Sequence, residues 1–250
     1  MSQKLANRVA VITGGNSGIG LATAKLFAAE GAKVVIAGRN KATIDAAVKD
    51  IGHGAMGMVS DVAQLSSIDA LYEKVNTKLG KIDVLAVNAG IVMMGPVEAV
   101  TEEMFDLVTN INYKGVFFSV QKALPYLNDG ASIIITSSTV AAKGLAGAGP
   151  YIASKAAERA LVRVFAAELV SRNIRVNALS PGSIPTPIFE KAGFATEQVN
   201  EMESFFKQAT PMKRLGTVDE MAKGFLFLAS DDSSYMTGGD LLLDGGFSNL

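Results

Sequence analysis

The chain of 250 residues has no cysteine and a single histidine. Without cysteine it can form no disulfide and no thiolate metal site, and thiol catalysis is excluded. The single histidine, His53, lies in the turn-like segment GHGAMG, and no neighbouring motif points to a Ser-His-Asp hydrolase or a histidine metal site. We therefore expect no bound metal, and any acid–base chemistry must use tyrosine, lysine, aspartate or glutamate.

Long apolar runs and blocks of like charge are also absent. No apolar run approaches the ~18 residues that a membrane span requires, and the polar start MSQKLANR lacks the character of a secretory signal. The 23 basic and 24 acidic residues give a net charge of −1, with no basic block to mark a nucleic-acid or membrane partner. With 49% apolar and 19% charged residues, the composition is that of an ordered globular protein. We expect it in the cytoplasm.

Short, β-branched apolar segments alternate along the chain with segments of helical periodicity. The apolar segments lie at 9–13, 33–38, 55–60, 82–88, 132–137, 174–180 and 240–246, and the helical ones include 19–30, 66–79, 102–127 and 153–171. The former are almost continuously apolar, which is typical of parallel strands covered on both faces. Repeated strand–helix alternation without a linker predicts a single domain over residues 1–250. We expect an α/β fold with a doubly wound, Rossmann-like parallel sheet and right-handed crossovers.

The segment 181–215 interrupts this alternation. It contains four prolines and only a weak helical pattern. It also follows the sixth predicted strand, and ligands of open α/β sheets bind beyond the carboxyl ends of the strands. Long irregular segments in compact domains are often functional. We therefore predict a substrate loop or lid at about 183–215.

Four glycines fall within TGGNSGIG, residues 13–20, directly behind the first predicted strand. Each costs about 0.5–1 kcal/mol relative to alanine in ordered structure, so the cluster indicates either a loose turn or a close approach to the backbone. A glycine-rich turn that opens a helix suits a phosphate, although the spacing differs from the common G-x-G-x-x-G, and a SAM-dependent methyltransferase also opens with such a turn. The candidate nucleotide-binding residues are Gly14, Asn16, Ser17, Gly18, Ile19 and Gly20.

Tyr151 and Lys155 are the candidates for acid–base chemistry. They lie four residues apart near the start of a predicted helix introduced by Pro150, so they share one face. An ammonium held near a phenol favours the phenolate, which allows a tyrosine to act as a general acid or base. The alternative is an ordinary amphipathic helix with a tyrosine at its edge.

Two further polar positions accompany this pair. Ser138 ends the preceding strand, where its hydroxyl could hydrogen-bond a carbonyl oxygen, and its neighbour Ser137 is the alternative. Asn112 lies in the middle of a predicted helix, where asparagine is locally unfavourable, which indicates a kink or a bound water. Asn110 is the alternative there.

Taken together, these motifs resemble the short-chain dehydrogenase/reductase family. They are T-G-x-x-x-G-x-G at 13–20, NAG at 88–90, Asn112, Ser138, YIASK at 151–155 and PGSIPT at 181–186, and the resemblance extends from Arg8 to Phe247. It implies that Ser138, which its spacing favours over Ser137, polarises a carbonyl. It further implies that Tyr151 donates the proton, Lys155 also holds the cofactor ribose, and Asn112 holds a water of the proton relay. The implied cofactor contacts also include Asp61, Val62, Asn88, Ala89, Gly90, Pro181, Gly182, Ile184 and Thr186.

The segment AGRN, residues 37–40, bears on the choice of cofactor. An NAD site usually has Asp or Glu at the end of the second strand, ~20 residues past the glycines, to bind the ribose 2′-hydroxyl. Here Gly38 leaves room, and Arg39, followed by Asn40, could pair with a 2′-phosphate. Alternatively, Arg39 is a solvated loop cation. We predict NADP(H) over NAD(H).

These observations predict hydride transfer between NADP(H) and an alcohol/ketone pair, mainly the reduction of an uncharged carbonyl compound. Alternatives are a 3-oxoacyl thioester reductase or sugar dehydrogenase of the same family, or a non-catalytic dinucleotide sensor. The expected pocket walls are Met93, Met94, Val140, Leu145 and Phe189. The family resemblance also implies a homotetramer, and two apolar-rich predicted helices and the tail LLLDGGFSNL are consistent with it.

Overall fold

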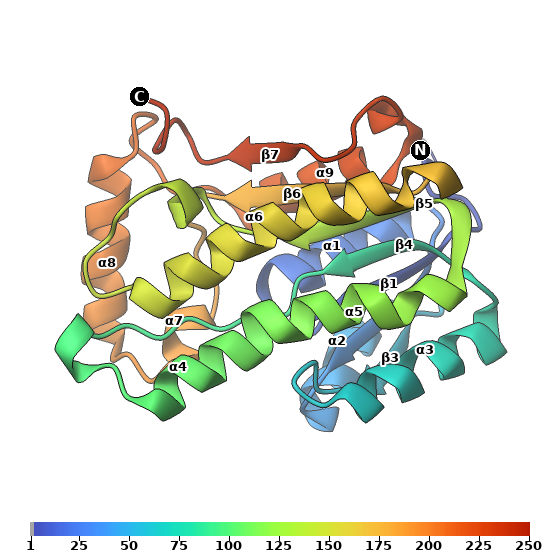
Figure 1. Ribbon diagram of the computed structural model, residues 1–250, viewed down its shortest axis with the longest axis horizontal. Helices are drawn as coiled ribbons and strands as arrows, with labels where there is room; N and C mark the ends of the chain where they lie inside the picture. The colour runs from blue at the N-terminus through green and yellow to red at the C-terminus, as the bar shows by residue number, and fades with distance from the viewer. Residues whose placement is uncertain (1–2) are drawn as a thin grey trace.

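Seven parallel strands form one sheet in the order β3-β2-β1-β4-β5-β6-β7 in the computed structural model, which describes residues 3–250. All strand pairs are parallel, as the sequence predicts. Figure 1 shows the sheet from the side of α5 and α6, with the arrowheads toward α7 and α8. The strands are β1 Val9–Thr13, β2 Lys33–Gly38, β3 Met56–Val59, β4 Ile82–Val87, β5 Leu127–Thr136, β6 Arg175–Pro181 and β7 Asp240–Leu243.

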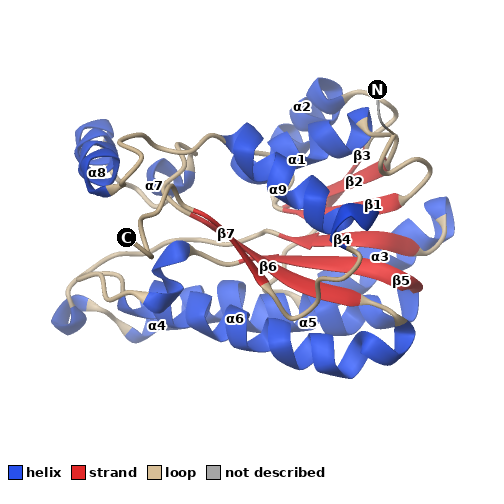
Figure 2. Ribbon diagram, turned by 90° about the horizontal axis from the view of Figure 1, so that it is seen from above, coloured by secondary structure: helices blue, strands red, loops and turns tan. Residues whose placement is uncertain are grey.

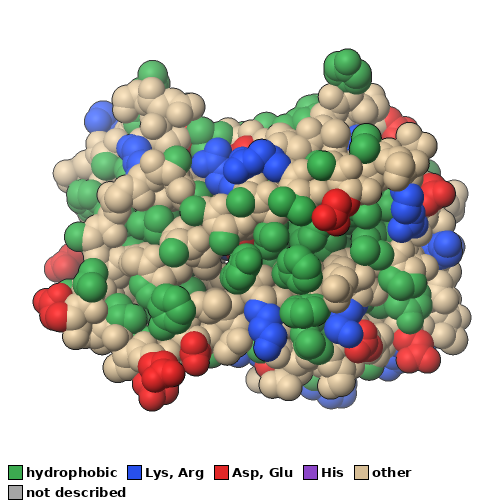
Figure 3. Space-filling model, in the orientation of Figure 1, with side chains coloured by type: hydrophobic (Ala, Val, Ile, Leu, Met, Phe, Trp, Pro, Cys, Tyr) green, Lys and Arg blue, Asp and Glu red, His purple; other side chains and the backbone are tan. Residues whose placement is uncertain are grey.

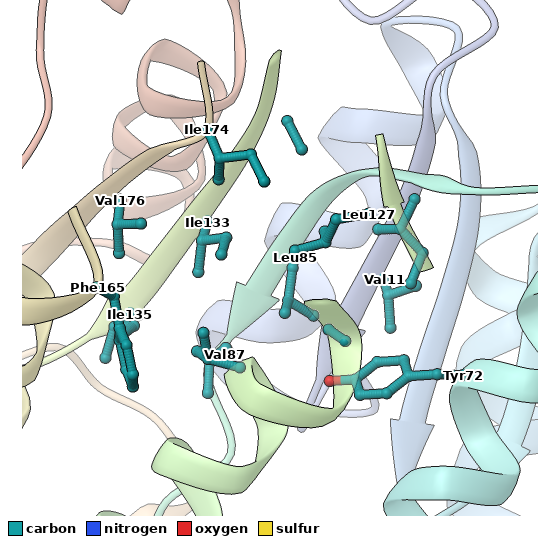
Figure 4. Packing of buried hydrophobic residues seen from close by; sticks show 14 of the residues in the cluster. Val11, Tyr72, Leu85, Val87, Leu127, Ile133, Ile135, Phe165, Ile174 and Val176 are labelled. Atoms are coloured by element: carbon teal, nitrogen blue, oxygen red, sulfur yellow. The ribbon is translucent and has the colours of Figure 1, made fainter. Parts of the chain in front are cut away.

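Helices cover both faces of the sheet (Figure 2). One face carries α3 Leu65–Leu79, α5 Gly115–Ala123 and α6 Gly149–Leu169, and the other carries α1 Gly18–Ala29, α2 Lys41–Ile51 and α9 Val218–Ala229. Successive strand residues point to opposite faces, so that Val11 packs with the first group and Ile12 with the second. Figure 4 shows the first group, where Tyr72 and Phe165 pack against strand residues. Both faces are buried, which explains the continuous apolar character of the strands.

The long helix predicted over 102–127 is divided in the structure. It consists of α4 Glu102–Val108, a π-helical turn at Thr109–Lys114, α5, and a 3₁₀ turn at Leu124–Tyr126. The chain then enters β5 at Leu127, five residues before the predicted strand begins. The early part of β5 pairs out of register: Leu127 lies opposite Ile82, and a shift precedes the pairing of Ser132 with Val84. The strand signal before residue 132 is weak because this part of β5 contains Asn128, Asp129 and Gly130, residue types that are rare in strands.

The segment predicted as a loop at 183–215 contains two helices, α7 Ile188–Lys191 and α8 Thr196–Ala209. They lie beyond the carboxyl ends of the strands, outside the two helical layers (Figure 2). The start of α8 is fixed by Gln198, whose side-chain oxygen accepts the N–H of Ala195 at 2.9 Å. Across residues 3–250, no helix is long and apolar enough to cross a membrane.

Candidate active site

The glycine loop connects β1 to α1 with a tight turn. Gly14 and Gly18 have φ angles of +66° and +53°, a conformation that favours glycine. The N–H of Gly14 donates to the carbonyl of Ala37 at 2.8 Å. A Cβ on Gly14 would lie 3.0 Å from Cα of Ala89, so the turn packs closely against the chain after β4. No side chain caps α1, and its first N–H groups remain available to an anion.

Thr13 and Asn88 connect the ends of β1 and β4. The hydroxyl of Thr13 accepts the N–H groups of Asn88 and Ala89 at 3.0 and 3.1 Å. The Asn88 amide nitrogen donates to the carbonyl of Thr13 at 3.1 Å. This double connection holds the segment 88–90 beside the glycine turn.

Apart from Gly20 and Asn112, the predicted site residues line a cleft of about 750 Å³ at the carboxyl ends of the strands. The predicted cofactor residues that line it are Gly14, Asn16, Ser17, Gly18, Ile19, Arg39, Asn40, Asp61, Val62, Asn88, Ala89, Gly90, Tyr151, Lys155, Pro181, Gly182, Ile184 and Thr186. Gly20 is different, because it lies within α1, where a Cβ would be 2.4 Å from the carbonyl oxygen of Gly14. Its role is to let the helix lie against the turn.

The expected apolar walls also line the cleft: Met93, Met94, Val140, Leu145 and Phe189. Phe206 of α8 and Phe247 of the tail also line the cleft, although neither was predicted as a wall residue, and their rings meet edge to face with centroids 5.8 Å apart. Only Phe247 gave a signal, as an apolar residue in the C-terminal tail. Both come from segments far apart in the chain, so no local pattern could bring them together.

Tyr151 and Lys155 lie on the cleft-facing side of α6, and Pro150 occupies the first turn of this helix as predicted. The Lys155 Nζ lies 5.7 Å from the centroid of the Tyr151 ring and donates to the carbonyl of Thr136 at 2.9 Å. It also lies 3.0 and 3.1 Å from the two carboxylate oxygens of Glu158. Burial lowers the pKa of Lys155, but the attraction of Glu158 and Tyr151 outweighs it, so that the pKa lies above its usual value.

Glu158 is a buried acid that the sequence argument did not single out. Its side chain is fully buried, and burial raises the pKa of its carboxyl to about 7, against the opposing effect of Lys155. The only signal in the sequence is its spacing of three residues from Lys155, on a helix face that continues with Leu161 and Val162.

The two serines at the end of β5 have different roles. The Ser137 hydroxyl donates to the backbone carbonyl of Lys155 at 2.9 Å, which occupies its proton. The Ser138 oxygen accepts only a long contact from the N–H of Val140 at 3.4 Å, and Ser138 lines the cleft. Its hydroxyl proton has no acceptor within residues 3–250 and can be donated to a ligand in the cleft.

Asn112 lies in the π-helical turn, and its side chain is fully buried behind the wall of the cleft. Its oxygen accepts the N–H of Ile91 at 2.9 Å, and its nitrogen donates to the carbonyl of Ile91 at 2.9 Å and to the Ser154 hydroxyl at 3.2 Å. A Cβ on Gly90 would lie 3.3 Å from the Asn112 oxygen and 3.5 Å from Lys155 Nζ, so both groups lie just behind Gly90. Asn110 is exposed, which distinguishes the two asparagines.

The far end of the cleft carries positive charge. Arg39 is exposed there, and its guanidinium has no ion pair within residues 3–250. Asn40 caps α2 by accepting the N–H of Thr43 at 3.1 Å. Gly38 is packed against Asn16, whose side-chain oxygen would lie 2.7 Å from an added Cβ. Asp61 accepts the N–H of Ala63 with one carboxylate oxygen at 3.0 Å.

Comparison with known proteins gives the family. A family model described as enoyl-(acyl carrier protein) reductase matches residues 14–248. A short-chain type dehydrogenase/reductase from Mycobacterium marinum superposes with a TM-score of 0.91 at 31% identity, covering 99% of this chain and 98% of that one. The chain belongs to the short-chain dehydrogenase/reductase family.

Other members of this family are similar over the whole chain. The 3-oxoacyl-(acyl-carrier-protein) reductase FabG of Thermotoga maritima is 41% identical over 249 residues, 97% of this chain and 98% of that protein. Levodione reductase has a TM-score of 0.92 at 33% identity over 98% of both chains. A 3-ketoacyl-(acyl-carrier-protein) reductase from Brucella melitensis, solved with NADH, has a TM-score of 0.91 at 34% identity, covering 98% of this chain and 99% of that one.

Membership confirms the predicted fold and class of activity: the protein is a dinucleotide-dependent oxidoreductase of this family. The cleft fits such a cofactor. The glycine turn and the uncapped N-terminus of α1 form one part of it, where an anion can bind, and Tyr151 and Lys155 line another part. Within residues 3–250, no group of three or more acidic or histidine side chains is arranged around a possible metal ion.

Proposed function

We propose that this short-chain dehydrogenase/reductase reduces an uncharged carbonyl compound to an alcohol, reversibly, with NADP(H). The observation that carries the proposal is that the Ser138 hydroxyl, Tyr151 and the Lys155 ammonium line one cleft together with the glycine turn. A non-catalytic dinucleotide sensor would have no need for this group of side chains.

The nicotinamide supplies the hydride when the cofactor is bound, and the chain supplies orientation and a proton. The Ser138 hydroxyl donates to the substrate carbonyl oxygen as negative charge develops there. The Tyr151 hydroxyl gives its proton to the same oxygen, and the Lys155 ammonium stabilises the phenolate that remains. Lys155 would also donate to a ribose hydroxyl. Asn112 lies outside the cleft, so its support for the relay runs through Ile91 and Ser154.

The walls of the cleft support an uncharged substrate. The side chains of Met93, Val140, Leu145 and Phe189 are apolar, and methionine adapts to irregular shapes. A 3-oxoacyl thioester is the second candidate, favoured by the similarity to the Thermotoga and Brucella proteins that carry that name. Helices α7 and α8 would act as the lid over this part of the cleft.

The preference for NADP(H) rests on Arg39. Its guanidinium makes no ion pair within residues 3–250 and lies at the mouth of the cleft, where it suits a 2′-phosphate. Residues 37–40 contain no acid that would repel one. We expect kcat/KM to favour NADPH over NADH by about tenfold or more, since one charged contact supplies ~1.4 kcal/mol. Equal values for the two cofactors would show that Arg39 is a solvated loop residue.

We also propose a homotetramer. Five large apolar side chains between α4 and the end of α6 are exposed: Phe105, Leu107, Tyr113, Val164 and Val170. Figure 3 shows apolar side chains gathered over the middle of this face. Such a patch often marks an interface. Light scattering at micromolar concentration should give four times the chain mass, and a monomeric mass would contradict the proposal.

The decisive experiment for the function is a screen of ketones and alcohols with both nicotinamide cofactors. Turnover is measured by the absorbance of the reduced nicotinamide. Turnover of an uncharged ketone supports the proposal, and turnover of 3-oxoacyl thioesters alone supports the second candidate. Cofactor binding without turnover of any substrate in the panel would favour a sensor.

A further inference from the structure

Glu158 is a buried acid in direct contact with the catalytic lysine. Tyr151, Lys155 and Glu158 follow one another on α6 at intervals of four and three residues, so they form one stripe of the helix. Both carboxylate oxygens of Glu158 are within 3.1 Å of the Lys155 Nζ. The ammonium has three hydrogens. The Thr136 carbonyl takes one of them, and the two carboxylate oxygens of Glu158 are within reach of the others, so a ligand in the cleft shares the ammonium with the carboxylate.

The elements packed against α6 bring no further charge to this pair. Among the described residues, Tyr151 is the one other titratable group that acts on it. The remaining charged or titratable side chains on the packed elements are exposed or have other partners. Three of them are exposed: Asp106, Tyr113 and Lys114. Two arginines form ion pairs, Arg159 with Asp240 and Arg172 with Asp129. The other two bind backbone carbonyls, Lys143 that of Phe247 and Arg175 those of Leu228 and Ser230.

Stability alone gives little reason for this acid. A buried ion pair contributes about as much to folding as well-packed apolar residues of similar volume, and often less. Glu158 lies on a helix face that continues with Leu161 and Val162, where an apolar side chain would pack equally well. The carboxylate is therefore better explained by what its charge does to its two neighbours on the stripe.

We propose that Glu158 is a positioning residue that tunes the acid of the reaction: its carboxylate compensates the Lys155 ammonium and so keeps Tyr151 in the protonated form that carbonyl reduction requires. This inference deepens the proposed function and rests on its assignment of Tyr151 as the proton donor. Lys155 alone would favour the phenolate strongly in this buried setting. With Glu158 beside it, the field at the phenol is reduced while the ammonium stays fixed and charged.

The test is the pH at which Tyr151 becomes a phenolate, measured by near-ultraviolet absorbance. The contribution of Tyr151 is obtained by subtracting the same titration of a protein that also carries Tyr151→Phe. Glu158→Gln removes the charge and keeps the size of the side chain and an acceptor for Lys155. We expect its transition to lie about one pH unit lower than that of the unmodified protein, because a unit charge two helical turns away along α6 acts at about that scale. Glu158→Asp, which keeps the charge, should stay close to the unmodified protein.

Glu168→Gln is the matched control, because Glu168 is exposed on the same helix. It should leave the transition unchanged. An unmoved or higher transition in Glu158→Gln would overturn the proposal. Should that variant fail to fold, Glu158→Met provides the same comparison with an apolar side chain of similar length. The titration needs no substrate, so it remains decisive even when the carbonyl screen finds none.

With a substrate in hand, the same shift has a kinetic counterpart. Alcohol oxidation needs the phenolate, so its kcat/KM in Glu158→Gln should reach its plateau at lower pH, and ketone reduction should decline at lower pH as well. A purely structural role of Glu158 would lower both rates without moving either profile.

Discussion

The side-chain amide of Asn112 pairs in both directions with the backbone of Ile91: its oxygen accepts the N–H and its nitrogen donates to the carbonyl, each at 2.9 Å. The two hydrogen bonds satisfy the backbone groups of Ile91, which lies after the end of β4. Asn112 itself lies in the π-helical turn between α4 and α5. The local departure from α-helical geometry thus lies where a buried side chain binds another segment.

Replacing Asn112 should therefore damage the wall of the cleft. Asn112→Ala leaves the N–H and carbonyl of the half-buried Ile91 without their partner, and a group of this kind that water does not reach costs about 1–3 kcal/mol. We expect a fall in melting temperature of several degrees together with weaker cofactor binding. Asn110→Ala is the control, because that side chain is exposed in the same turn. Equal effects of the two substitutions would contradict this account.

Tyr151→Phe keeps the ring and removes the ionisable hydroxyl. We expect kcat to fall by about 100-fold or more, the usual contribution of a positioned acid or base, while the cofactor dissociation constant stays within a factor of about two. Single-turnover rates and cofactor fluorescence measure the two quantities separately. Full activity of this variant would exclude Tyr151 as the proton donor.

Lys155→Met should lose both activity and stability. The substitution leaves the carboxylate of Glu158 buried without its partner, and breaking a buried pair in this way costs about 3–5 kcal/mol. The double variant Lys155→Met/Glu158→Met should recover the melting temperature and remain inactive. Comparison of the two by thermal unfolding and turnover separates the catalytic role of Lys155 from its structural one. A double variant as unstable as the single one would argue against the ion pair.

The stability contribution of Glu220 depends on pH. Hydrogen bonds from Arg214, at 2.7 and 2.9 Å, and from the N–H of Thr217 lower the pKa of this carboxyl to about 2. Since the pKa is lower in the folded than in the unfolded state, the contribution is present above the unfolded value and is lost as pH falls toward 2. Glu220→Gln keeps an acceptor for the Thr217 N–H and removes only the charge paired with Arg214, so it should lower the melting temperature by about 1–2 °C near neutral pH, for an exposed ion pair worth about 0.5 kcal/mol. The difference should shrink as the buffer is acidified; a constant difference would show that the charge has no part in it.

The fold could be predicted from the sequence because its signals are local. An apolar run such as Val9–Thr13 predicts a strand, and the glycines that follow it predict a turn and the start of a helix. Neither prediction needs information from distant residues. The parts that escaped prediction depend on contacts between distant segments. Asn112 indicates a kink in the helix, but its partner Ile91 could not be identified from the sequence, and neither could the contact between Phe206 and Phe247. Glu158 escaped because a charged residue on an amphipathic helix is usually solvated, and only the packed structure shows that it is not.

The cofactor preference should reverse in Gly38→Asp/Arg39→Leu. The aspartate would repel a 2′-phosphate and accept hydrogen bonds from a 2′-hydroxyl, while the loss of Arg39 removes the cation that favours NADP(H). The new Cβ must displace the side chain of Asn16, whose oxygen would lie 2.7 Å away and whose nitrogen donates to Thr43 at 2.9 Å. For this reason Gly38→Ala/Arg39→Leu is the matched control: it has the same steric effect without the carboxylate. We expect the control to bring the NADPH/NADH ratio of kcat/KM toward one, and the aspartate variant to move it about tenfold further toward NADH. If both variants gave the same ratio, the carboxylate would have no contact with the ribose, and the end of β2 would not determine the choice of cofactor.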